Sequence, residues 1–209
     1  MHPDTIARYF TRADGTFQFR RWPAPMVPGV FGEAVPDHRL LEATFAEVES
    51  ITGQQIRRDG DGSEMNATFW FVRAWGDLLK IPGTEGMLGA LGGIVKDLVD
   101  SNPPFRRSVT IDASTGGIGQ MALIVQTTKF GIARPMEERL LRLVVHSQLV
   151  WAMGKDFPGL MEDGPGDSKV LSAPVRAILS VAYDPSLPDA SNDPAVSGQI
   201  ADLIASAGS

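Results

Sequence analysis

One nine-residue stretch, HSQLVWAMG at residues 146–154, comes nearest to a chemical site in this sequence. Zinc peptidases carry H-E-x-x-H on a helix, because residues four apart share one face. Two imidazoles then reach one Zn²⁺ while the glutamate acts on the bound water. Many such helices continue to a glycine three residues further on. With Gly154 in that place, the ligand, acid and second-ligand positions fall on Ser147, Gln148 and Trp151, which cannot do this chemistry.

The single histidine of this stretch lies one residue out of that register. With His146 as the first ligand, Ser147 takes the place of the acid and Val150 that of the second ligand, so this register fails as well. The other histidines, His2 and His38, are far away along the chain. We therefore predict no metal site, and an apolar core helix whose three polar residues make local hydrogen bonds.

Composition and charge limit the classes of function. A chain of 209 residues with 43% hydrophobic residues is long and apolar enough for one globular domain with a real core. Its net charge of -6 argues against nucleic acid and anionic membranes as partners. The absence of cysteine excludes disulfides, thiolate metal ligands and cysteine nucleophiles. The apolar run GMLGALGGIV has about half the length of a transmembrane helix, and MHPDTIARYF lacks the pattern of a secretory signal.

Two glycine-rich stretches have features of ligand loops but are better explained as turns. STGGIG, residues 114–119, would need a following helix to bind a nucleotide, and QMALIVQ predicts a strand there. DGDGSE, residues 59–64, lacks the sixth-position glycine and the twelfth-position glutamate of a calcium loop. The sequence also has no G-x-S-x-G and no G-x-x-x-x-G-K-[ST]. We therefore predict no cofactor.

The elements that must position HSQLVWAMG follow from periodicity, prolines and glycines. Helices are predicted over residues 4–10, 37–52, 83–100, 135–153, 172–183 and 193–206. Strands are predicted near 26–31, as a hairpin around the Asp-Gly turn of 54–75 with a central second strand, and as two strands within 105–128. Residues 155–169 are predicted to form a surface loop. This order predicts an α+β fold, a single domain over residues 1–209 with helices packed on a mixed sheet.

Several segments, taken in order, resemble a proteobacterial domain family of unknown function whose members are often labelled lipoproteins and look zincin-like. The segments are FRRWPAPMVPGVFG, LLEATFAEVESITGQQI, NATFWFV, GQMALIVQ, EERLLRLVVHSQLVWAMG and VRAILSVAYDPSLP. The positions that match the motifs of this family are Arg21, Trp22, Pro25, Ile51, Thr52, Gly53, Leu149, Met153, Gly154, Tyr183, Asp184 and Pro185. The resemblance covers roughly residues 6–190.

The resemblance implies a zincin-like core over residues 21–190, preceded by a helix and turn in 1–20 and followed by a C-terminal helix or tail in 191–209. It also implies a periplasmic or envelope location if an N-terminal signal was removed, and a cytoplasmic one otherwise. The chain departs from the family at its acidic pair, which Ser147 and Gln148 replace, and at a glutamine that Trp151 replaces. This departure puts in doubt any activity that the acidic pair supports.

Three functions stay open. The leading hypothesis is a non-catalytic zincin-like domain whose cleft, formed by His146, Ser147, Gln148 and Trp151, binds a peptide or protein partner or is plugged by Trp151. The second is a hydrolase with His146 as its base, which requires a ring nitrogen open to a pocket and near a carboxylate or hydroxyl. The third is a purely structural domain of the cell envelope, which a sealed cleft would favour.

Overall fold

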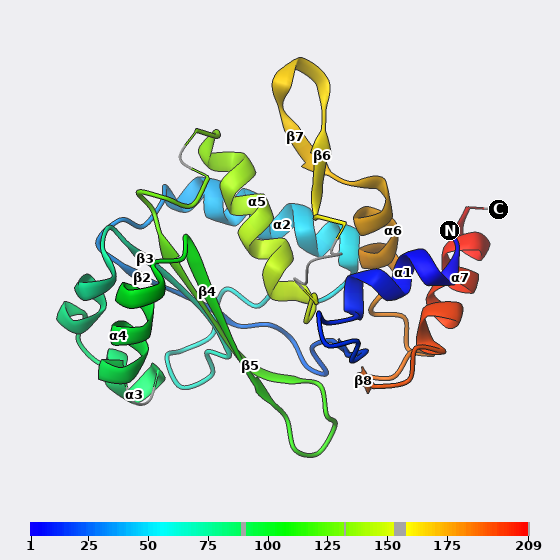
Figure 1. Ribbon diagram of the computed structural model, residues 1–209, viewed down its shortest axis with the longest axis horizontal. Coiled ribbons are helices and arrows are strands. Elements are labelled where there is room, and N and C mark those ends of the chain that lie inside the picture. The colour runs from blue at the N-terminus through cyan, green and yellow to red at the C-terminus, as the bar shows by residue number, and fades with distance from the viewer. Residues whose placement is uncertain (89–90, 132, 153–157, 209) are drawn as a thin grey trace.

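A four-stranded mixed sheet forms the centre of the fold (Figure 1). Across the sheet, the strands are β2 (Pro28–Gly32), β3 (Ala67–Val72), β5 (Ile118–Gln126) and β4 (Phe105–Ile111). β2, β3 and β5 run parallel, whereas β4 is an edge strand antiparallel to β5. The structure is a computed structural model that describes residues 1–88, 91–131, 133–152 and 158–208.

Two helices, α2 (His38–Thr52) and α5 (Met136–Gln148), pack on one face of the sheet and on each other (Figure 1). α2 begins where the carboxylate of Asp37 accepts a hydrogen bond from the Arg39 N–H, and it ends at Gly53 in a left-handed conformation. Its buried residues meet the apolar side chains of β3 and β5 in the main core. The interface removes these apolar faces from water, which is the main stabilising term of the fold.

The opposite face of the sheet is only partly covered. The 3-10 helix η1 (Trp75–Lys80) and α4 (Leu91–Ser101) lie there, preceded by α3 (Thr84–Leu88). Val95 and Leu98 of α4 pack over Trp70 and Ile124 in a smaller second core. The rest of this face carries polar side chains.

The remaining elements join the two ends of the chain to the core. They are α1 (Pro3–Phe10), β1 (Phe19–Arg20), β6 (Met161–Asp163), η2 (Pro165–Asp167), β7 (Lys169–Leu171), α6 (Ala173–Val181), β8 (Ala190–Ser191) and α7 (Val196–Ala207). α1 packs against α7, β1 pairs with β8, and the hairpin β6–β7 projects from the body (Figure 1). The chain is therefore a single compact α+β domain with a mixed sheet, as the sequence predicts. None of the helices in the described part of the chain has the length and apolar character needed to cross a bilayer.

The hairpin predicted around the Asp-Gly turn of residues 54–75 is wrong. Its second half forms β3, which is central as predicted, but β3 pairs in parallel with β2 and β5. Before it, Ile56 makes an isolated bridge with Met26. β3 carries large apolar side chains on both faces. It is therefore stable as a central strand, with a neighbouring strand on each side and helices over each face.

The predicted helix 135–153 is also too long, since α5 ends at Gln148. Leu149 is extended, with φ -137°, and bridges to Arg21, while the Val150 N–H donates to the Arg20 carbonyl. Tertiary pairing therefore replaces the last helical turn. Met153 and Gly154 lie outside the described residues. The predicted loop 155–169 contains β6 and the first residue of β7, so that prediction is only partly right.

Candidate functional site

The four residues of the predicted cleft lie in the protein interior. Trp151, Ser147 and Gln148 have none of their surface exposed, and His146 has 1%. Trp151 stacks on Phe10 and meets Tyr9 edge-on. The expected opening at this turn is therefore filled by aromatic side chains from α1, and Trp151 plugs it.

Side chains from distant segments cap the C-terminal carbonyls of α5. The indole N–H of Trp22 donates to the Ser147 carbonyl at 2.7 Å, and the Tyr183 hydroxyl donates to the Gln148 carbonyl at 2.6 Å. The indole N–H of Trp151 reaches the Val145 carbonyl at 2.9 Å. The end of a helix leaves four carbonyls without intrahelical partners. Trp22 and Tyr183, which stand at motif positions in the sequence, thus cap the C-terminal end of α5.

Arg21 fixes the segment that brings Tyr183 to this place. Its guanidinium donates to the carbonyls of Ala182, Asp184 and Leu187 at 2.7–3.0 Å and to the Asp189 carboxylate at 2.9 Å. Because Arg21 is only 8% exposed, these bonds form in a poorly solvated place and hold the turn after α6 firmly. In the sequence, Arg21 stands out only as a motif position, and these contacts are not predicted.

The local hydrogen bonds predicted for the three polar residues form at two of them. The Ser147 hydroxyl donates to the Val144 carbonyl at 2.6 Å, and the Gln148 amide donates to the same carbonyl at 3.4 Å. Neither ring nitrogen of His146 has a hydrogen-bond partner in the described structure. The prediction is wrong for His146, whose ring lies 5.2 Å from that of Phe105.

The environment of His146 also does not meet the requirement of a hydrolytic base. Burial, together with the charges of Arg107 and Arg142, lowers the pKa of this imidazole to about 3. The open nitrogen that the hydrolase hypothesis requires is not present, since the residue is 1% exposed. His146 is thus a neutral core residue. Among the residues that the structure describes, no group of three or more His, Asp or Glu side chains could hold a metal ion.

STGGIG is a hairpin turn, as predicted. Its backbone follows β4 and leads into β5, and the Asp112 carboxylate accepts hydrogen bonds from the N–H and hydroxyl groups of Ser114 and Thr115. These bonds lower the pKa of Asp112 to about 2. The donors of this turn, which would bind a phosphate in a nucleotide loop, are therefore occupied by the Asp112 carboxylate.

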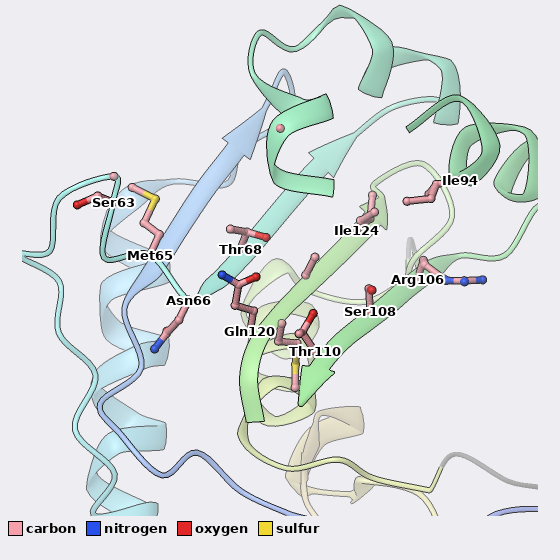
Figure 2. A pocket seen from close by; sticks show the side chains of 14 residues that line it. Ser63, Met65, Asn66, Thr68, Ile94, Arg106, Ser108, Thr110, Gln120 and Ile124 are labelled. Carbon is pink, nitrogen blue, oxygen red and sulfur yellow. The ribbon is translucent and has the colours of Figure 1, made fainter. Parts of the chain in front are cut away.

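A cavity of about 490 Å³ opens on the half-covered face of the sheet, which we call the sheet-face pocket (Figure 2). Thr68, Ser108, Thr110 and Gln120 rise from three neighbouring strands, and Arg106 closes one side (Figure 2). The register places Thr68 and Ser108 on either side of Ala122 in one row across the sheet, and it pairs Thr110 with Gln120 in the next row, so polar side chains occupy two neighbouring rows. Such a surface can donate and accept hydrogen bonds but carries little charge.

A second cavity, of about 310 Å³, lies between α5, the start of β4 and the β6–β7 hairpin, and we call it the basic pocket. Its charged lining residues are Lys129, Arg134, Glu138, Arg139, Arg142 and Lys169. Sequence reasoning missed this pocket. The one available signal is the spacing of Glu138 and Arg142, which places them on one face of the predicted helix.

β4 lies between the two pockets. Arg106, Ser108 and Thr110 line the sheet-face pocket, whereas Phe105, whose side chain points to the other face, lines the basic pocket. This alternation follows from the two-residue period of a strand.

No known protein family, no curated protein and no solved structure matches this chain.

Proposed function

We propose that this chain is a non-catalytic zincin-like domain that binds an extended peptide segment of a partner protein along the edge of β4. The mixed sheet with α2 and α5 on one face agrees with the architecture that the sequence resemblance implies. In the sequence, Ser147, Gln148 and Trp151 take the positions that a zinc motif gives to imidazole and carboxylate, and all three side chains are buried.

The observation that carries the proposal is the outward side of β4. The N–H of Gln126 donates to the Pro104 carbonyl, which sets the phase of the antiparallel ladder. Backbone groups at alternate positions, namely Phe105, Arg107 and Val109, then point away from β5. No residue in the described ranges pairs with these groups. Such an edge accepts a further strand unless something blunts it.

The side chains around β4 add selectivity to backbone pairing. A segment paired with β4 would direct its side chains alternately to the two faces of the sheet. One set would meet the polar groups of the sheet-face pocket, and the other would lie near Phe105 and the basic pocket. Alternating pockets of this kind give strand-addition sites their sequence preference.

A purely structural role is the second candidate, and the filled turn at the end of α5 favours it. The two functions differ in what they require of β4. A structural domain needs no partner there, whereas the binding domain needs the outward N–H groups.

The experiment is a selection of peptides from a displayed library on the purified chain, followed by affinity measurements. Val109→Pro removes one outward N–H but no bond of the ladder to β5, because proline is tolerated at such edge positions. We expect this variant to bind the selected peptides at least about tenfold more weakly than the wild type. Val109→Thr, which keeps the N–H, is the matched control and should bind normally.

Hydrogen exchange on the wild type makes the test independent of how well Val109→Pro folds. Bound peptide should slow the exchange of the Phe105, Arg107 and Val109 amides. Undiminished binding by Val109→Pro, or protection at other amides instead, would contradict the proposal. Stoichiometric zinc bound near Ser147, measured by elemental analysis and anomalous scattering, would contradict its non-catalytic part.

A further inference from the structure

The basic pocket concentrates positive charge in a chain whose net charge is -6. Five of its lining residues are cationic and one is acidic. The acid, Glu138, is already engaged: one oxygen accepts from the Lys169 backbone N–H at 2.6 Å, and the other lies 3.6 Å from Arg134. Glu138 can therefore neutralise only one of the five positive charges that line the pocket.

The partners of the other cations do not remove this excess. Lys169 forms an ion pair with Asp163, but Lys129 bonds to the neutral amide of Asn102. Arg139 donates from one Nη to the Thr127 carbonyl at 2.7 Å, and its Nε is buried without a hydrogen-bond partner. Within the described ranges, Arg142 has neither a hydrogen bond nor an ion pair.

These charges lie partly out of water: Arg139 is half-buried, and Arg142 keeps part of its side chain exposed. Burial lowers the pKa of both Arg139 and Arg142, and the charge of Arg134 lowers that of Arg142 further. Like charges held together near an apolar wall are destabilising, and a bound anion would offset both the repulsion and the lost hydration.

The rest of the lining is apolar. Phe105 and Phe130 meet edge-on with their centroids 5.4 Å apart, and Leu160 and Met161 complete the wall. The cavity lies near the lower end of the roughly 300–1,000 Å³ range of small-molecule sites. A ligand that fits has a charged end for the guanidinium groups and an apolar body for the two phenyl rings.

We propose that the basic pocket binds an organic anion, that is, a carboxylate or phosphate carried on an aromatic or aliphatic body. Arg142 is the principal anion ligand, because its planar guanidinium can bind two oxygens at once and has no competing partner in the described structure. The site shares Phe105 with the proposed strand binding, but its anion ligands are side chains of α5 and it uses no backbone group of β4.

The test uses phenyl phosphate and benzoate as probes, with binding followed by NMR of backbone amides. Both probes should give saturable shifts confined to residues near Phe105, Phe130, Gly131 and Met161. Inorganic phosphate, which lacks the apolar body, should bind at least about tenfold more weakly than phenyl phosphate.

Two variants make the test specific. Arg142→Gln should weaken both organic probes at least about tenfold. Arg176→Gln, at an exposed arginine of α6 outside the pocket, should change nothing. Equal binding by wild type and Arg142→Gln, or unsaturable shifts spread over the surface, would overturn the proposal.

Competition between phenyl phosphate and a peptide bound on β4 identifies the source of the anion. Displacement means that an acidic residue of the bound segment occupies the pocket, and simultaneous binding means that a separate small molecule does. Both results support an anion site. If no peptide binds β4, the titration with phenyl phosphate still shows whether the basic pocket binds an anion. Failure of the strand-binding proposal can thus be told apart from failure of the anion-site proposal.

Discussion

The two ends of α5 treat polar groups in opposite ways. At its C-terminal end, the carbonyls of Val145, Ser147 and Gln148 each receive a donor from Trp151, Trp22 or Tyr183. Towards its N-terminal half, Arg142 has no partner in the described structure and Arg139 keeps a buried nitrogen unpaired.

This contrast separates the roles of the two ends. Buried polar groups are normally paired, because leaving one unpaired costs roughly 1–3 kcal/mol. The closed end follows this rule at three carbonyls, which stabilises the fold, whereas both ring nitrogens of His146 there stay unpaired. The charged groups at the open end stabilise the fold less than they could, as we expect of a surface that binds a ligand.

The largest expected effect is on Trp151, the plug of the closed end. Trp151→Ala should lower the free energy of unfolding by about 3–5 kcal/mol, because it leaves a cavity among Phe10 and Tyr9 and frees the Val145 carbonyl. Trp151→Phe, which loses chiefly the hydrogen bond, should cost about 1–2 kcal/mol. Chemical denaturation measures both. A cost below about 1 kcal/mol for the alanine variant would mean that the closed end does not stabilise the fold.

The next effect is a pH dependence caused by His146, which lies at the closed end of α5. Its pKa in the folded protein is about 3, against 6.5 for the unfolded chain, because burial and the charges of Arg107 and Arg142 disfavour the protonated ring. Between these values the unfolded chain binds more protons, so stability falls as the pH is lowered. From pH 7.5 to 5.0 the loss from this group should be about 2 kcal/mol.

His146→Leu is the control for this loss, since the carboxylates titrate equally in both proteins. The variant should lack the contribution of about 2 kcal/mol and should also be more stable at pH 7.5, where it removes two unpaired ring nitrogens. Identical pH profiles of unfolding for the two proteins would show that His146 is solvated or paired.

The smallest effects compare one polar group at each end. Tyr183→Phe should lower the free energy of unfolding by about 1 kcal/mol, because the Gln148 carbonyl loses its donor. Arg142→Gln should change it by less than about 0.5 kcal/mol, because no hydrogen bond or ion pair is lost. Thermal and denaturant unfolding measure both variants. An arginine effect larger than that of the tyrosine would reverse the comparison.

The sequence predicted the elements whose signals are local. Asp37 and Gly53 marked the two ends of α2, the glycine-rich turn marked the β4–β5 hairpin, and the apolar faces of β3 marked it as central. Capping, turn chemistry and periodicity act over a few residues, so one chain is enough to read them.

The sequence by itself also determined that positions 147, 148 and 151 carry neither imidazole nor carboxylate, so the ligands of a zinc motif are missing there. Only the tertiary structure decided that this turn is sealed. Trp22 and Tyr183 lie 125 and 35 residues away from the carbonyls that they cap, and α5 ends early because Leu149 pairs with Arg21. The edge of β4 and the basic pocket likewise depend on which strands and loops become neighbours. Such contacts join segments without a shared local pattern, and their energy exists only once the whole chain has folded.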